Sequence, residues 1–256
     1  MDDLFNFTYK LIERASIVVL ENLNKIQKIS YKKSDFDLVT NVDHKVEALI
    51  LKEINSKYPS HSIVTEESGK FKKDPNYKWF IDPIDGTTNF AHGYPCFCIS
   101  IAFQKKGIVE LGLIKNPVTG ELYSAIKDKG AKLNERKITV SKIRKLKDSL
   151  LVTGFPYDRK TSKANNLKNF CNLTMRTQGV RRDGAAAMDL CYVACGKLDG
   201  FWEIKLNPWD VAAGVLLVKE AGGRVTDFKG NDYDIFNDKI VATNELIHWE
   251  LLKHLK

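Results

Sequence analysis

The sequence predicts a mixed fold, with an α+β first half and an α/β second half. Residues 3–23 and 42–54 carry apolar side chains at mostly three- and four-residue spacings, which predicts two amphipathic helices. Five strand-like stretches then follow between residues 62 and 127, which favours a mostly antiparallel sheet behind those helices. From residue 149 onward, strand and helix patterns alternate, as is typical of an α/β unit.

The elements of the first half follow from this pattern and from its interruptions. The second helix has Thr40 or Asn41 as its expected N-cap, since either side chain can accept a hydrogen bond from the first turn. The five strands are expected at 62–67, 78–82, 96–103, 108–117 and 120–127. Because Pro83 has no N–H and a fixed φ, we expect the second of these strands to end at Asp82.

The second half contains longer apolar helices. We expect a strand at 149–155, a polar helical stretch, a helix at 184–196, a strand at 198–204, a helix at 210–223 and a strand at 239–244. The basic segment 136–147 holds six Lys and Arg residues and marks a boundary. It predicts an N-terminal subdomain, residues 1–140, and a C-terminal subdomain, residues 141–256.

Composition narrows the class of protein. A chain of 256 residues with 43% hydrophobic content can bury a large core. No apolar run approaches the roughly 20 residues that span a bilayer, and the start, MDDLFNFTYK, lacks a basic signal region. We therefore expect a cytoplasmic protein that does not enter the membrane. The five cysteines are odd in number and form no C-x-x-C pair, so reduced core residues are expected rather than a zinc site or disulfides.

The formal net charge of +8 fits an anionic substrate, a nucleic acid or simple solubility. Segment 136–147 has no aromatic residue among its basic ones that could stack on a base. A solvated connecting segment is the favoured interpretation. Nucleic-acid binding is disfavoured but stays open, and salt-dependent retention on RNA or DNA would support it.

The most informative stretch is WFIDPIDGTTNF, residues 79–90. Asp82, Asp85 and the Ile84 carbonyl can converge across a tight turn, and such hard oxygen ligands suit Mg²⁺. Gly86 permits close approach of the backbone, and the N–H groups near Thr87 and Thr88 could hold a phosphate oxygen. The alternative is an ordinary Asp-Gly surface turn.

Two acidic positions that are distant in the sequence also indicate a cation site. Glu66 and Glu67 directly follow an apolar stretch, where a bound cation explains an acidic pair better than packing does, although a solvated loop is the alternative. Asp210 stands at the start of a strongly apolar helix. The alternative to a metal-binding role here is a purely structural N-cap.

Taken together, these stretches resemble the inositol monophosphatase family of metal-dependent, lithium-sensitive phosphatases. The resemblance covers nearly the whole chain, including DLVTNVD (37–43), RRDGAAAMDL (181–190) and DGFWEIKLNPWD (199–210), and is strongest to bacterial members. It implies a layered α-β-α-β-α sandwich of the inositol monophosphatase and fructose-1,6-bisphosphatase type. It also implies a site in the cleft between the subdomains, and a homodimer.

The resemblance also implies roles for individual residues. Two or three Mg²⁺ ions would be held by oxygen ligands from Glu66, Asp82, Ile84 (carbonyl), Asp85 and Asp210. Water attack would depend on Glu66, Thr87 and Asp43, although Asp43 could equally be a simple cap of the second helix. The substrate would be contacted by Asp85, Gly86, Thr87, Gly184, Ala186, Glu203 and Asp210.

The expected activity is hydrolysis of inositol 1-phosphate or a related small polyol or sugar phosphate by a metal-activated water. Fructose 1,6-bisphosphate, NADP or a nucleotide phosphate are alternative substrates, and a role in a transcription complex is a further possibility. The short Lys-rich stretch between Glu66 and Asp82 could close over the site or leave it open. A haloacid-dehalogenase-type phosphatase is disfavoured, because Asp82 and Asp85 are separated by two residues rather than one.

Overall fold

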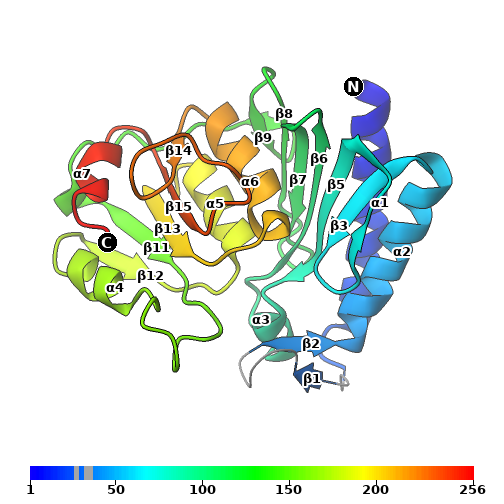
Figure 1. Ribbon diagram of the computed structural model, residues 1–256, viewed down its shortest axis with the longest axis horizontal. Helices are drawn as coiled ribbons and strands as arrows, with labels where there is room; N and C mark the ends of the chain where they lie inside the picture. Colours follow the sequence, from blue (N-terminus) through cyan, green and yellow to red (C-terminus); the bar gives the residue numbers. More distant parts are fainter. Residues whose placement is uncertain (26–28, 32–36) are drawn as a thin grey trace.

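The computed structural model describes residues 1–25, 29–31 and 37–256, which form five alternating layers (Figure 1). Helices α1 (Asp2–Asn22) and α2 (Asn41–Lys57) cover one face of a large sheet. Helices α5 (Ala186–Ala194) and α6 (Pro208–Glu220) lie between that sheet and a smaller one. Helices α4 (Leu167–Thr174) and α7 (His248–Leu252) lie on the outer side. The expected α-β-α-β-α sandwich is confirmed.

The large sheet has eight strands in the order β10-β9-β8-β7-β6-β5-β3-β4. Only the β3–β5 pair is parallel, which confirms the mostly antiparallel sheet. Its strands are β3 (His61–Thr65), β4 (Gly69–Phe71), β5 (Asp74–Asp85), β6 (Cys98–Lys105), β7 (Ile108–Lys115), β8 (Leu122–Ile126), β9 (Ala131–Leu133) and β10 (Arg136–Lys137). Two short strands, β1 (Ile29–Tyr31) and β2 (Leu38–Thr40), pair separately.

The smaller sheet has five strands in the order β12-β11-β13-β15-β14. Its first three strands are parallel and its last two antiparallel to their neighbours. The strands are β11 (Leu150–Thr153), β12 (Gly179–Arg181), β13 (Gly200–Ile204), β14 (Arg224–Thr226) and β15 (Lys239–Thr243), and a 3₁₀ turn, η1 (Leu146–Asp148), precedes them. The predicted polar helix shrinks to α4, because the rest of that stretch forms turns.

The expectation that the second strand ends at Asp82 is wrong. β5 continues through Pro83 to Asp85, but its pairing with β6 is irregular there: Asp82 pairs with Ser100 and Asp85 with Cys98. Two residues of β5 therefore stand opposite one of β6, as in a β-bulge. Pro83 is tolerated inside the bulge, where its missing N–H costs no ladder hydrogen bond.

Helices α5 and α6 join the two sheets into one core. Both are apolar on nearly all sides, as expected for helices that contact a sheet on each face. At Gly112 of β7, an added Cβ would lie 2.9 Å from the Ala213 Cα, so only glycine allows α6 to pack this closely. The polypeptide passes from one sheet to the other between Lys137 and Leu150. The division into residues 1–140 and 141–256 stays a prediction.

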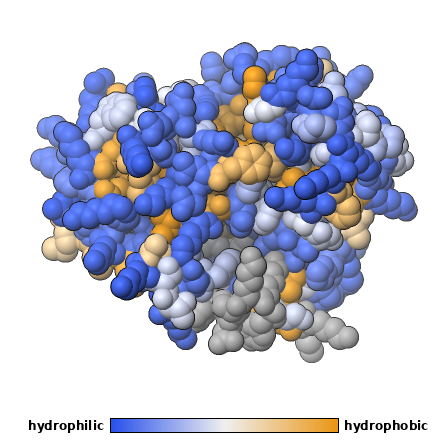
Figure 2. All heavy atoms as spheres, in the orientation of Figure 1, coloured by the Kyte–Doolittle hydropathy of each residue, from blue (hydrophilic) through white to orange (hydrophobic). Residues whose placement is uncertain are grey.

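On the face shown in Figure 2, hydrophobic residues form separate patches among hydrophilic ones.

The six basic residues of segment 136–147 are all exposed. The segment begins with the edge strand β10 and then runs from the large sheet to η1, so its first two residues belong to a strand and the rest connects the two sheets. The five cysteines are unpaired, and Cys171 is exposed rather than in the core. Among the described residues, no helix is long and apolar enough to cross a membrane.

Candidate active site

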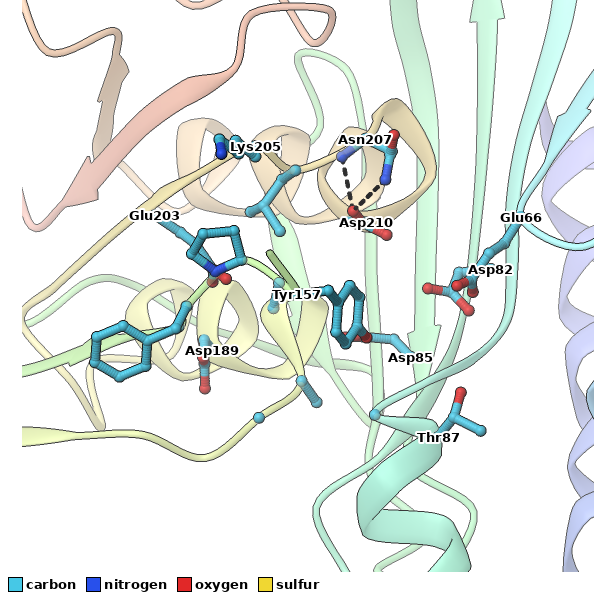
Figure 3. Close-up of a pocket in the computed structure, with 18 of the residues that line it drawn as sticks. Glu66, Asp82, Asp85, Thr87, Tyr157, Asp189, Glu203, Lys205, Asn207 and Asp210 are labelled. Atoms are coloured by element: carbon cyan, nitrogen blue, oxygen red, sulfur yellow. Dashed lines mark hydrogen bonds between the residues drawn. The ribbon is translucent and has the colours of Figure 1, made fainter. Parts of the chain in front are cut away.

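A cleft lies where the ends of β5 and β13 face the first turns of α3 (Thr87–Ala91), α5 and α6 (Figure 3). The space that solvent can occupy inside it is about 110 Å³, and the cleft opens to solvent. Its walls contain ten residues predicted from the sequence: Glu66, Asp82, Ile84, Asp85, Gly86, Thr87, Gly184, Ala186, Glu203 and Asp210. The eleventh, Asp43, lies directly behind Thr87.

The bulge of β5 places the aspartate loop at the edge of the cleft. Asp82 Oδ1 accepts a hydrogen bond from the Ile84 amide (3.0 Å), which fixes the turn locally. Asp85 Oδ2 accepts one from the Ala187 amide of α5 (2.7 Å), so residues far apart in sequence meet here. The loop is therefore a structured part of the cleft wall and not a free surface turn.

Gly86 is required at the end of this loop. It is the N-cap of α3, with φ +90°, a left-handed conformation that glycine adopts without strain. A Cβ at this position would also lie 3.0 Å from the Cys96 carbonyl oxygen. Thr87 and Thr88 are the first two residues of the helix. The N–H groups of a first helical turn have no helical acceptor, and Gly86 and Thr87 line the cleft.

Asp43 combines the two roles that the sequence left open. Its Oδ2 accepts hydrogen bonds from the Thr40 amide (2.9 Å) and hydroxyl (2.5 Å), so Thr40 and Asp43 form the capping box of α2. Its Oδ1 lies 3.1 Å from Thr87 Oγ1, which is also 3.0 Å from the Ile84 carbonyl oxygen. The start of α2 thus holds the Thr87 hydroxyl in place.

Glu47, one helical turn further along α2, was not singled out by the sequence. It is 2% exposed and accepts hydrogen bonds from the Thr65 hydroxyl, the Glu67 amide (3.0 Å) and the Ser68 hydroxyl. These donors flank Glu66 on both sides, so Glu47 fixes the segment that carries Glu66. A single glutamate in an amphipathic helix gives no sequence signal for this role, because most such residues are solvated.

Asp210 enters the cleft from α6, but not as the N-cap that the sequence suggested. The helix begins at Pro208 with Asn207 as its cap, and Asp210 is the third helical residue. Asp210 Oδ2 accepts a hydrogen bond from the Asn207 amide (2.7 Å), which completes a capping box. Figure 3 shows the rest of the carboxylate directed into the cleft, on the side of Asp82 and Glu66.

Burial, together with the charges of neighbouring carboxylates, sets the electrostatics of this end of the cleft. Burial, and then the negative charges of Glu66, Asp85 and Asp210, raise the pKa of Asp82 well above its usual value. Burial raises the pKa of Asp85 to about 7. Burial and the charge of Glu66 likewise raise the pKa of Asp210. Such a site is stabilised by a cation that neutralises the repulsion.

The donor set is oxygen-only, as a hard divalent cation requires. Within residues 1–25, 29–31 and 37–256, no group of three or more His, Cys, Asp or Glu side chains is already arranged to hold a metal ion. The hydrogen bonds of Asp82, Asp85 and Asp210 to backbone amides each engage one carboxylate oxygen. Asp82 is also linked to Glu66 by a side-chain hydrogen bond, so these two acidic groups lie in direct contact.

The opposite end of the cleft carries a second acidic pair (Figure 3). Glu203, 7% exposed on β13, has its pKa raised to about 8 by burial. A Cβ at Gly154 would lie 2.2 Å from Glu203 Oε1, so only glycine leaves room for this carboxylate. Asp189 of α5, 1% exposed, also lines the cleft, and the sequence did not identify it. Gly184 has φ +87°, and a side chain at this position would collide with Arg182, which also lines the cleft.

Comparison with known proteins agrees with this arrangement. The model of the inositol monophosphatase family matches residues 1–256. The chain is 49% identical to an inositol-1-monophosphatase of Synechocystis over 90% of this chain and 81% of that protein. It is 38% identical to the Nus factor SuhB of Vibrio cholerae over 100% of this chain and 97% of that protein. The solved inositol monophosphatase of Anabaena superposes with a TM-score of 0.90 at 43% identity, covering 99% and 95% of the two chains.

The fold and the cleft define a layered α/β protein whose acidic site is shared between two sheets. With a family match along its entire length, the chain belongs to the inositol monophosphatase family.

Proposed function

We propose that this protein is a Mg²⁺-dependent phosphomonoesterase that hydrolyses inositol 1-phosphate or a related small polyol or sugar phosphate. The observation that carries the proposal is the division of one cleft into two acidic ends. Glu66, Asp82, Asp85 and Asp210 crowd at one end, where a cation and a phosphate would sit. Glu203 lies at the other end, where the alcohol part of the substrate would sit.

Mg²⁺ would be held by Glu66, Asp82, the Ile84 carbonyl, Asp85 and Asp210, and would supply an activated water and neutralise phosphate charge. The chain's own residues supply orientation. The Thr87 hydroxyl donates a hydrogen bond to Asp43 Oδ1. The lone pairs of the Thr87 oxygen are then free to accept a hydrogen bond from an attacking water. Glu66 is proposed as the base beside that water.

The phosphate would bind against the first turn of α3. Gly86 and Thr87 line the cleft, and their N–H groups would donate to phosphate oxygens. The backbone of Gly184 and Ala186 would contact the alcohol, and Glu203 would accept hydrogen bonds from its hydroxyls. No residue is needed as a covalent nucleophile.

A phosphate-release panel tests the substrate. Inositol 1-phosphate, fructose 1,6-bisphosphate, NADP and a nucleotide monophosphate would be compared with p-nitrophenyl phosphate, whose leaving group has no hydroxyl. We expect the highest kcat/KM on inositol 1-phosphate, and a selective loss on it in Glu203→Ala. Equal kcat/KM values on all compounds, or an equal loss of kcat/KM on all of them in Glu203→Ala, would show that Glu203 does not recognise the alcohol part of the substrate.

A second role, association with nucleic acid or a transcription complex, is favoured by two observations. Segment 136–147 exposes all six of its basic residues, and a relative that matches the full chain is named a Nus factor. We expect any such binding to weaken steeply with salt, because it would depend on phosphate contacts. No retention on RNA at low salt would remove this role. A homodimer is also expected, and sedimentation would test it.

A further inference from the structure

Asp189 is a buried carboxyl group on the cleft wall. It is 1% exposed, and its backbone amide is engaged within α5, 3.0 Å from the Ala185 oxygen. Its Oδ1 is buried without a hydrogen-bond partner among the described residues. Native proteins leave few buried polar atoms unpaired, so this one calls for an explanation.

The other acidic residues of the cleft behave differently according to which end they occupy. Asp82, Asp85 and Asp210 each accept a hydrogen bond from a backbone amide. Within the described parts of the chain, Asp189 Oδ1 is buried without a hydrogen-bond partner. Glu203, 7% exposed, lies near it at the same end. The alcohol end therefore contains a buried carboxyl group whose hydrogen-bonding capacity the described residues leave unused.

We propose that Asp189, together with Glu203, forms a two-carboxyl site that binds hydroxyl groups of the substrate's alcohol part. Figure 3 shows Asp189 and Glu203 near each other, on the side of the cleft away from Glu66 and Asp82. Two carboxyl groups offer four oxygen atoms, which can pair with several hydroxyls of a polyol or sugar. The inference rests on the proposed function and adds Asp189 to the residues that would contact the alcohol part.

The charges around Asp189 support a hydroxyl ligand over a salt bridge. Burial raises the pKa of Asp189, and the neighbouring charges of Asp183, Glu203 and Asp85 add to that effect. Arg182 lowers it, but Arg182 lies on the exposed rim. A hydroxyl group can donate to a carboxylate or accept from a carboxylic acid, so it satisfies Asp189 in either protonation state.

Binding and turnover of inositol 1-phosphate test this site together. Asp189→Asn keeps the shape of the side chain, Asp189→Ala removes its polar atoms, and Asp232→Asn is the control, since Asp232 is exposed and does not line the cleft. We expect both Asp189 variants to lower kcat/KM for inositol 1-phosphate about tenfold, the loss of roughly one hydrogen bond to a polar group. Hydrolysis of p-nitrophenyl phosphate and the control variant should stay near wild type.

Two further measurements separate this inference from the proposed function. In calorimetry with Ca²⁺ present, Asp189→Ala should bind inositol 1-phosphate more weakly than wild type does. This comparison holds even if the wild-type protein does not hydrolyse inositol 1-phosphate. The melting temperature of Asp189→Asn should stay equal or rise, because an unpaired buried carboxyl destabilises the fold. The inference would be overturned if the Asp189 variants bound inositol 1-phosphate as tightly as wild type, or if wild type did not bind it. Equal losses of kcat/KM on inositol 1-phosphate and p-nitrophenyl phosphate would also overturn it.

Discussion

Replacing Glu47 tests how the fold positions Glu66. Glu47 accepts hydrogen bonds from Thr65, Glu67 and Ser68, the residues around Glu66. Asp43, four residues earlier on the same face of α2, holds Thr87. One helix therefore fixes both loops of the acidic end, and loss of Glu47 should release one of them.

The magnitude follows from the burial of the donors. The Thr65 side chain is fully buried (0% exposed), so its hydroxyl cannot turn to water when Glu47 becomes alanine. Leaving a buried group unpaired costs about 1–3 kcal/mol, and hydrogen bonds to a charged acceptor contribute about 1.5–3 kcal/mol each. Glu67 and Ser68 lie nearer solvent, so water can replace part of the hydrogen bonding that they lose. We expect Glu47→Ala to lower the free energy of unfolding by about 3 kcal/mol, and the melting temperature by about 6–12 °C.

Thermal unfolding and Mg²⁺ titration of p-nitrophenyl phosphate hydrolysis measure the two consequences. Because Glu66 loses its support, the Mg²⁺ concentration for half-maximal activity should rise about 10–100-fold, as is common when groups that orient metal ligands are removed. Glu47→Gln keeps one acceptor oxygen and should give intermediate values. The control is Glu53→Ala on the same helix, which loses only a surface ion pair with Arg14 (3.1 Å). Glu47→Ala values equal to those of the control would refute the reasoning.

Four other outcomes are expected. Asp85→Asn should abolish turnover while circular dichroism stays native, and an active Asp85→Asn enzyme would contradict its placement at the acidic end. Gly154→Ala should displace the Glu203 carboxylate and depress kcat/KM for inositol 1-phosphate but not for p-nitrophenyl phosphate; an equal effect on both would exclude this reason. Burial raises the pKa of Asp85 to about 7 and that of Glu203 to about 8, so the melting temperature of EDTA-treated protein should fall as pH rises from about 4 through those values. Mg²⁺ should reverse the part of the loss due to Asp85, a proposed ligand, and not the part due to Glu203; a flat profile in EDTA would argue against the burial of these carboxyl groups. Li⁺ at subsaturating Mg²⁺ should inhibit, and full activity in millimolar-range Li⁺ would require revision of that part of the family expectation.

The layered fold could be predicted because its long elements repeat clear patterns. The two N-terminal helices and the alternating second half follow from apolar spacing. Elements of two to five residues, such as β12, β14, α3 and α7, were missed because they are too short to show a period. The end of β5 was misjudged because the sequence shows Pro83 but not the bulge that accommodates it.

The acidic end of the cleft was visible in the sequence because its carboxylates interrupt apolar stretches at turns. Asp82, Asp85 and Asp210 all lie at such positions, and the structure brings them into one cleft. Glu47 and Asp189 were missed because each lies inside a helix pattern, where a lone acidic residue is ordinarily solvated. Only the three-dimensional neighbours show that these two side chains are buried.

The central claim is metal-dependent hydrolysis at the shared cleft, and a Mg²⁺ titration of phosphate release from inositol 1-phosphate tests it most directly. Purified protein would be stripped with EDTA, assayed, and restored by adding Mg²⁺, with Asp85→Asn beside it as the control. We expect no release in EDTA, saturable recovery with Mg²⁺, and none in the variant. Release of phosphate by the EDTA-treated protein at the full rate would contradict the account.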